Sequence, residues 1–315
     1  MSRMLFIGIN YYAYIGKISA AFSRQGYDVD YREIEDVGFW SKTHKKLSPA
    51  AYRRRLDHYH LSLIDEAAAT RYDVVFFLQC HHFSYENMQR LRASQPKARF
   101  VLYNWDSLST HDYRPWLTHF DKAVTFDPKD AADLDITYLP LFATRDFFEV
   151  DPAATKEFDL YFVGAIGTMH RFNALKKLHA FCRGHGIRTH FHLKCSPVVM
   201  VKLLLGRQWL PGLSLRSIGF ADIVRLIERS RAVFDFANHA QSGYTMRFIE
   251  NMCAGQKIIT ENARVAAESF YSRDRFLVID NLDFSGIPEF LAAPVTSELD
   301  AEAFSVDSWT RDLLE

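Results

Sequence analysis

A glycine, an arginine and a glutamate lie within residues 243–250, at a spacing that could bind an anion next to a diol. The backbone N–H groups from Gly243 to Arg247 would be free at a helix start, where the helix dipole is positive. The Arg247 guanidinium adds a fixed positive charge, so the segment suits a diphosphate. Glu250 lies further along the helix and could accept two hydrogen bonds from a ribose. A polar helix start with Glu250 in solvent is the alternative, and these residues alone leave both open.

The elements around this segment are predicted to form a βαβ unit. Apolar residues at 232–236 and 257–260 have the composition of strands. Residues 245–254 have helical spacing, and Gly255 ends the helix. Strand, helix and strand in this order require a parallel sheet. The helix therefore begins at the carboxyl end of a strand, where open α/β sheets bind ligands.

Gly164 and Gly167 form a second loop that could bind phosphate. They follow an apolar strand at 158–164 and precede a helix predicted at 172–183. Arg171 lies at the start of that helix, where a cation is unfavourable beside the helix dipole unless an anion binds there. A surface arginine is the alternative.

Polar side chains follow two buried strands in the first half of the chain. His81 and His82 follow the strand at 72–78, and Asp106 follows the strand at 99–103. The expected role is that of a general base, with Asp106 preferred over His81, and a hydrogen-bonded structural role is the alternative. Adjacent histidines in a strand point to opposite faces, so we expect no metal site here.

The length and composition indicate a globular α/β protein with two domains. A chain of 315 residues exceeds what one core usually holds, so two domains of about 150 residues are expected. A polar segment at 151–157 is the predicted linker, which divides the chain into domains at 1–150 and 151–315. The net charge of zero argues against nucleic acid as a partner. The four scattered cysteines are typical of a cytoplasmic protein.

Two segments could contact a membrane. The segment from Phe39 to Leu56 interleaves six Lys and Arg residues with aromatic ones and has no acid, which suits anionic lipid headgroups. A solvated basic helix is the alternative. Residues 198–210 are apolar and could pack in a core or face a membrane. No apolar run approaches the roughly 18 residues that span a bilayer, so a cytoplasmic location is expected, with the inner face of the membrane as a finer hypothesis.

The sequence Glu-Asn-Met-Cys-Ala-Gly at 250–255, followed by Ile-Ile-Thr, resembles the donor-site helix of glycosyltransferases of the GT-B fold. The resemblance implies two Rossmann-like domains that face each other across a cleft, an acceptor domain and then a donor domain. It implies that Glu250 binds the nucleotide ribose and that the backbone of Thr245 and Met246 contacts the diphosphate. In the same family a basic residue after the first donor-domain strand contacts the donor phosphates, which corresponds to Arg171.

The longer run from Gln241 to Glu250 resembles a bacterial subgroup of capsule, exopolysaccharide and lipopolysaccharide biosynthesis. This implies transfer of a sugar from a nucleotide-sugar donor to a surface glycan or lipid-linked acceptor. No cofactor is implied, since the nucleotide sugar is a substrate. Many retaining members carry a Glu at the place of Ser242, so an inverting reaction is expected. A metal-independent reaction is expected because no Asp-x-Asp site lies where such a metal site is needed. A nucleotide-sugar epimerase of the same architecture and a non-catalytic sugar-nucleotide binding protein remain alternatives.

Overall fold

The computed structural model describes residues 1–11, 13–35, 48–236 and 242–315. The chain divides into two compact units. Unit 1 comprises residues 1–141, 239–244 and 306–315, and unit 2 comprises residues 142–238 and 245–305. Each unit contains one six-stranded sheet, and every strand pairing between named strands is parallel.

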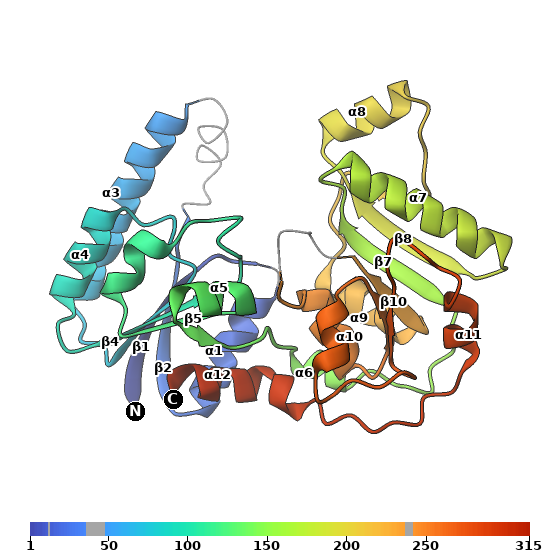
Figure 1. The fold of residues 1–315 in the computed structure, drawn as a ribbon. Helices are drawn as coiled ribbons and strands as arrows, with labels where there is room; N and C mark the ends of the chain where they lie inside the picture. Colours follow the sequence, from blue (N-terminus) through green and yellow to red (C-terminus); the bar gives the residue numbers. More distant parts are fainter. Residues whose placement is uncertain (12, 36–47, 237–241) are drawn as a thin grey trace. The chain divides into compact units, whose positions relative to one another are not determined.

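The sheet of unit 1 has the strand order β2-β1-β3-β4-β5-β6. Its strands are β1 (Ser2–Gly8), β2 (Tyr27–Glu33), β3 (Val74–Leu78), β4 (Arg99–Asn104), β5 (Lys122–Thr125) and β6 (Thr137–Tyr138). Its helices are α1 (Tyr14–Arg24), α3 (Pro49–Ala68), α4 (Tyr85–Ser94), the 3-10 helix η1 (Arg114–His119), α5 (Pro128–Leu134) and α12 (Val306–Leu314). Figure 1 shows α3 and α4 beside each other in this unit.

Helices cover both faces of this sheet because its central strands are apolar on both sides. All five residues of β3 are buried. Phe77 belongs to the core that contains Leu63 of α3 and Met88 of α4. Phe76, which points to the other face, packs edge-on against Phe22 of α1 and Trp309 of α12. A continuous apolar strand is typical of a sheet enclosed in this way.

The sheet of unit 2 has the strand order β12-β11-β10-β7-β8-β9. Its strands are β7 (Leu160–Ala165), β8 (Thr189–Lys194), β9 (Leu213–Ser214), β10 (Ala232–Asp235), β11 (Lys257–Thr260) and β12 (Phe276–Val278). Its helices are α6 (Arg145–Phe148), α7 (Met169–Gly184), α8 (Pro197–Leu205), α9 (Phe220–Glu228), α10 (Met246–Cys253), α11 (Ile287–Ala292) and the 3-10 helices η2 (Ala263–Ala267) and η3 (Glu302–Phe304).

The central strand β7 separates two layers of helix. Leu160 and Phe162 lie in a core with Leu175 and Leu178 of α7. Tyr161, between them, donates a hydrogen bond of 2.9 Å to Asn251 of α10 on the other face. The two units therefore each have the predicted Rossmann-like architecture, with helices on both faces of a parallel sheet.

The boundary between the units differs from the prediction of 1–150 and 151–315. The change occurs after Leu141, because α6 belongs to unit 2, where Phe147 packs against Phe220 with ring centroids 5.5 Å apart. The last ten residues belong to unit 1. Residues 239–244 also belong to unit 1, although the flanking elements β10 and α10 belong to unit 2.

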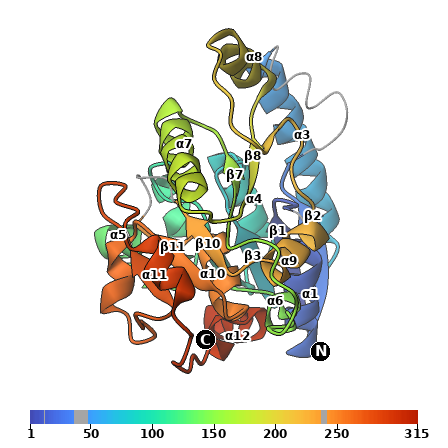
Figure 2. The ribbon, with the colours of Figure 1, turned by 90° about the vertical axis from the view of Figure 1, so that its right-hand side faces the viewer.

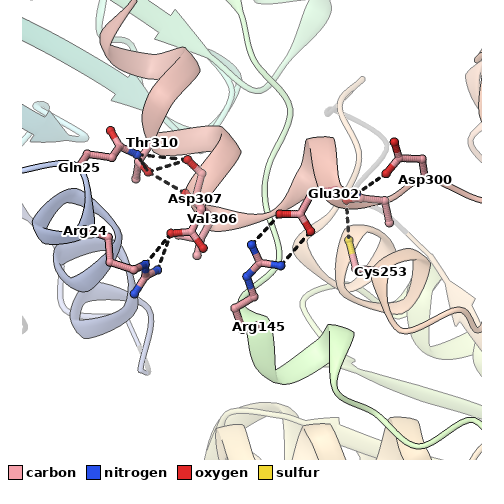
Figure 3. A network of polar contacts seen from close by, with 10 residues as sticks. Arg24, Gln25, Arg145, Cys253, Asp300, Glu302, Val306, Asp307 and Thr310 are labelled. Carbon is pink, nitrogen blue, oxygen red and sulfur yellow. Dashed lines mark hydrogen bonds and ion pairs between the residues drawn. The ribbon is translucent and has the colours of Figure 1, made fainter.

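The return of α12 to unit 1 has a clear physical cause. Trp309 is 1% exposed and lies edge-on to Tyr103, with ring centroids 4.7 Å apart. Polar contacts hold the helix from outside: Arg24 donates to Asp307 at 2.8 Å, and Gln25 donates to Thr310 at 2.5 Å (Figure 3). Burial of one large aromatic side chain contributes several kcal/mol, which is enough to hold this helix in unit 1.

Candidate functional site

The start of α10 is held by an acid that sequence reasoning did not single out. Thr245 is the N-cap residue, and its hydroxyl accepts a hydrogen bond of 3.0 Å from the N–H of Phe248. The same hydroxyl donates to Asp235 at 2.7 Å, and Thr260 donates to the other oxygen of Asp235 at 3.0 Å. Asp235 thus connects β10, β11 and the start of α10. Its position at the end of an apolar strand was the available signal.

Asp235 is buried, and this burial raises its pKa. The hydrogen bonds from Thr245 and Thr260 act in the opposite direction, as do the charges of Arg171 and Arg247. The carboxyl group therefore lies within the electrostatic range of both arginines that were predicted to contact a diphosphate.

Arg171 lies in the first turn of α7, with its guanidinium folded into unit 2. Thr168, the N-cap residue, accepts a hydrogen bond of 3.2 Å from the N–H of Arg171. The guanidinium lies over the rings of Phe162 and Phe236, at 5.4 and 5.8 Å from their centroids. One terminal nitrogen, Nη2, donates to the carbonyl of Phe236 at 2.5 Å. This arrangement excludes the interpretation of Arg171 as an ordinary surface arginine.

One donor of Arg171 is unused within the described part of the chain. Its Nε is buried and has no hydrogen-bond partner there. Burial lowers the pKa of Arg171, and the charge of Asp235 only partly opposes this. A buried N–H of a partly buried cation costs free energy unless an acceptor, such as a phosphate oxygen, binds it.

The two loop glycines that precede Arg171 differ in their surroundings. A Cβ at Gly164 would lie 2.8 Å from Cζ of Phe162 and 3.3 Å from Nη2 of Arg171. A Cβ at Gly167 would meet no atom within 4 Å. The absence of a side chain at Gly164 is therefore needed for the position of the Arg171 guanidinium. At Gly167 no neighbouring atom would prevent a ligand from approaching the backbone.

Arg247 and Glu250 are paired with each other. Nη1 of Arg247 donates to Oε2 of Glu250, one turn along α10. The Glu250 side chain is fully buried, and 19% of the Arg247 side chain is exposed. Asn251 also donates to the carbonyl of Arg247, at 2.8 Å. Met246 is the first residue of α10 and is partly exposed. The ribose role of Glu250 stays a prediction, and it requires Glu250 to serve a ribose in addition to Arg247.

The loop before α10 also departs from expectation at Gly243. The N–H groups of Ser242 and Gly243 donate to Oδ2 of Asp127, at 2.7 and 3.4 Å. A Cβ at Gly243 would lie 2.5 Å from the carbonyl oxygen of Phe126, so only glycine fits this approach. The Gly243 N–H was predicted to be free for a diphosphate, but here it has a carboxylate partner. Asp127 is a second residue that sequence reasoning missed.

Asp127 is the N-cap of α5 and accepts from the N–H of Lys129 at 3.0 Å as well. Burial acts to raise its pKa, but the hydrogen bonds from Ser242, Asp130 and Lys129 outweigh burial and lower it. Asp127 is therefore an ionised anchor for the loop in unit 1.

The predicted catalytic residues lie together at the carboxyl ends of β3 and β4. Gln79 donates to Oδ2 of Asp106 at 2.5 Å. The rings of His81 and His111 are stacked, with centroids 3.7 Å apart and 10° between their planes. Burial raises the pKa of Asp106, and the nearby charge of His111 opposes this. A carboxyl group with a raised pKa near the imidazole of His111 is suited to proton transfer.

The backbone before this cluster is strained. Gln79 has φ of 67°, in the left-handed region that residues with a side chain rarely adopt. Such strain is found most often at functional sites.

The prediction that His81 and His82 point to opposite faces of a strand is wrong. Both residues lie in a turn after β3 and not in the strand, and their ring centroids are 4.1 Å apart. His82 pairs with Glu35, with 3.3 Å between Nε2 and Oε1. Among the residues that the structure describes, no group of three or more His, Cys, Asp or Glu side chains could hold a metal ion.

No family model matches the sequence, and no curated protein shows significant sequence similarity to it. Solved structures do resemble it over the whole chain. AviGT4, a glycosyltransferase of avilamycin A biosynthesis, matches with a TM-score of 0.62 and 12% identity, over 100% of this chain and 96% of AviGT4. The lipopolysaccharide outer core galactosyltransferase WaaB, in its apo form, matches with a TM-score of 0.56 and 12% identity, over 99% of each chain.

An epimerase is about equally similar. The UDP-GlcNAc 2-epimerase of Neisseria meningitidis, bound to UDP-GlcNAc, matches with a TM-score of 0.58 and 9% identity, over 100% of this chain and 98% of the epimerase. The chain therefore has the GT-B fold that these glycosyltransferases and epimerases share.

Proposed function

We propose that the chain is a glycosyltransferase that moves a sugar from a nucleotide-sugar donor to a bacterial surface glycan or lipid-linked acceptor. The observation that carries the proposal is the partly buried Arg171 side chain, whose buried Nε has no hydrogen-bond partner within the described residues. It lies after the first strand of unit 2, which is the place where the GT-B resemblance expects a contact with the donor phosphates. The similarity of the fold to AviGT4 and WaaB supports the same function.

In the proposed donor site, unit 2 binds the nucleotide diphosphate through charge and backbone N–H groups. Arg171 offers its Nε, and the open backbone at Gly167 allows close approach. Arg247 and the backbone of Thr245 and Met246 complete the cation-rich surface. Glu250 would hold the ribose while it keeps its bond to Arg247.

The proposed reaction is a direct displacement. Asp106 accepts the proton of the acceptor hydroxyl, whose oxygen forms the new bond to the anomeric carbon. The bond from that carbon to the diphosphate oxygen breaks, and the electron pair leaves with the nucleoside diphosphate. Arg171 and Arg247 stabilise the negative charge of the departing group without a metal. The geometry of displacement inverts the anomeric centre, and His81 is the second candidate for the base.

The membrane contact predicted for Phe39–Leu56 is part of the proposal, as is action at the inner face of the cytoplasmic membrane. Residues 36–47 lie outside the described part of the chain. In the described part, Arg53, Arg54 and Arg55 are exposed on α3. Among the described residues, no helix is long and apolar enough to cross a bilayer. Charge reversal at these three arginines is expected to weaken binding to anionic vesicles without lowering stability.

Calorimetry with UDP and with uridine tests the donor site. Arg171→Gln is expected to weaken UDP binding by about tenfold or more and to leave uridine nearly unchanged, since only UDP carries the diphosphate. Arg188→Gln is a matched control, because Arg188 also belongs to unit 2 but pairs with Asp159 at 2.8 Å. Equal losses for UDP and uridine would show that Arg171 only supports the fold.

The epimerase alternative has support from the similarity to the Neisseria meningitidis enzyme. Incubation with UDP-GlcNAc and no acceptor separates the two functions. A glycosyltransferase leaves the sugar unchanged or slowly hydrolyses it, whereas an epimerase produces the 2-epimer. Turnover that persists in EDTA is expected for the transferase proposed here.

A further inference from the structure

Helix α8 packs on the core of unit 2 through Leu203, Val199 and Met200, and it presents its other large apolar side chains to solvent. Of its nine residues only Leu203 is buried. The exposed fractions are 64% for Val198, 54% for Val201, 55% for Leu204 and 81% for Leu205. Exposed apolar clusters of this kind usually mark an interaction surface.

The cluster continues past the end of the helix. Gly206 is the C-cap of α8, and Arg207 adopts φ of 49°, which turns the chain back toward β9. Trp209 follows and is 59% exposed. Trp is an amphipathic aromatic residue that is enriched where apolar and aqueous phases meet. Figures 1 and 2 both show α8 at an outer end of unit 2, beyond the end of α7.

The charged residues of the sequence around this cluster are exclusively cationic. From residue 160 to residue 221 the sequence contains no Asp or Glu, but it contains nine Lys and Arg residues. Four of these flank the cluster and are exposed: Lys194, Lys202, Arg207 and Arg216. None of the four forms an ion pair within the described residues.

We propose that Val198, Val201, Leu204, Leu205 and Trp209 form a docking surface for an anionic lipid bilayer. The apolar side chains would enter the boundary between headgroups and acyl chains, as those of an interfacial helix do. The four flanking cations would lie at the level of the headgroups, each contributing to attraction by negative lipid. The long acid-free stretch suits a wide negative surface, because it contains no carboxylate that such a surface would repel. This surface belongs to unit 2 and differs from the basic segment of unit 1.

Flotation of the purified protein with phosphatidylcholine vesicles, with and without phosphatidylglycerol, tests the proposal. The protein is expected to float with the phosphatidylglycerol vesicles at low salt. The variant Val201→Glu/Leu205→Glu is expected to lower the partition coefficient by about tenfold or more. Lys202→Gln/Arg207→Gln is expected to lower it by about fivefold per charge, an effect that disappears in high salt. Neither donor nor acceptor is needed, so the result does not depend on the proposed transferase activity.

The control is Val295→Glu, which places one glutamate on another exposed apolar residue of unit 2. It is expected to float like the wild type. The proposal is overturned if the wild type does not float, or if the Val201→Glu/Leu205→Glu variant floats equally well. A concentration-dependent dimer that this variant abolishes, without vesicle binding, would instead assign the surface to a second copy of the chain. Quenching of Trp209 by brominated lipid, with Trp209→Phe as the blank, locates the contact.

Discussion

At the level of single residues, the proposed binding of a diphosphate by unit 2 depends on the position of Arg171. The Arg171 guanidinium lies over two phenylalanine rings, and this packing fixes a group that would otherwise extend into water. The packing is possible only because residue 164 lacks a side chain. The two positions therefore act together, although they are seven positions apart in the sequence.

Gly164→Ala is expected to weaken UDP binding by about tenfold, because its Cβ would force the Phe162 ring and the Arg171 guanidinium to move. Titration calorimetry with UDP measures the effect. Gly184→Ala in the same unit is the control, since a Cβ there meets no atom within 4 Å. An unchanged affinity in Gly164→Ala would mean that the position of Arg171 does not matter for the diphosphate.

Asp106→Asn is expected to lower turnover by about 100-fold or more while donor affinity is retained, since it removes the base and keeps the shape. The stability should stay equal or rise. The pKa of Asp106 is raised in the native state above its ordinary value of 3.8, which applies to the unfolded chain. As the pH rises from this ordinary value to the raised one, the unfolded chain releases its proton more readily, so the native state loses stability. Asparagine removes that cost and can still accept from Gln79.

Turnover and thermal unfolding at neutral pH are the two measurements for this variant. Normal turnover would move the role of base to His81, and a large loss of stability would mean that the carboxylate is structural. In the wild type, activity is expected to fall as the pH drops through the raised pKa of Asp106, because the base must be ionised.

At the level of elements, the start of α10 depends on a hydroxyl that serves two partners. Thr245 accepts from the helix N–H of Phe248 and donates to Asp235. The predicted role of Thr245 used only its backbone. The structure adds a side-chain role that connects the helix to the strand before it.

Thr245→Val is expected to lower the free energy of unfolding by about 1–3 kcal/mol, since it removes the cap and leaves one oxygen of Asp235 without its donor. Urea unfolding measures this loss. Thr245→Ser keeps the hydroxyl and is expected to restore most of the stability. If serine and valine are equally destabilising, the methyl packing of Thr245 matters more than its hydroxyl.

At the level of the whole molecule, the chain crosses between the units more than once. It leaves unit 1 after Leu141 and returns with α12, whose Trp309 lies in the core of unit 1. The C-terminal helix is thus part of the N-terminal unit. In unit 2, Arg145 and Glu302 pair at 2.6 Å, which holds the segment that leads to this helix (Figure 3).

Trp309→Ala is expected to destabilise the protein by about 3–5 kcal/mol, because it leaves a cavity between Phe76 and Tyr103. Urea unfolding monitored by circular dichroism measures the change. Trp209→Ala is the matched control, since Trp209 is 59% exposed, and it is expected to change stability by less than about 0.5 kcal/mol. Similar effects in both variants would contradict this account of α12.

Local pattern alone predicted most of the secondary structure and the fold class. The predicted strand at 257–260 is β11, and the predicted helix at 245–254 is α10 within its cap residues. Such features depend on interactions between residues a few positions apart, which periodicity and turn residues report directly. The positions of Asp106 and His81 at strand ends followed from the same pattern.

Contacts between distant residues were decided only by the tertiary structure. The pairing of Asp127 with Ser242 and the place of Trp309 in unit 1 join residues more than one hundred positions apart. The exposure of α8 is of the same kind, because the apolar sequence of 198–210 fits a core and a surface equally well. By itself the sequence determined the βα order and the candidate anion-binding residues. The local sequence does not show which N–H groups, carboxylates and apolar faces already have partners, because these partners come from residues that are distant in the sequence and are brought together only by packing.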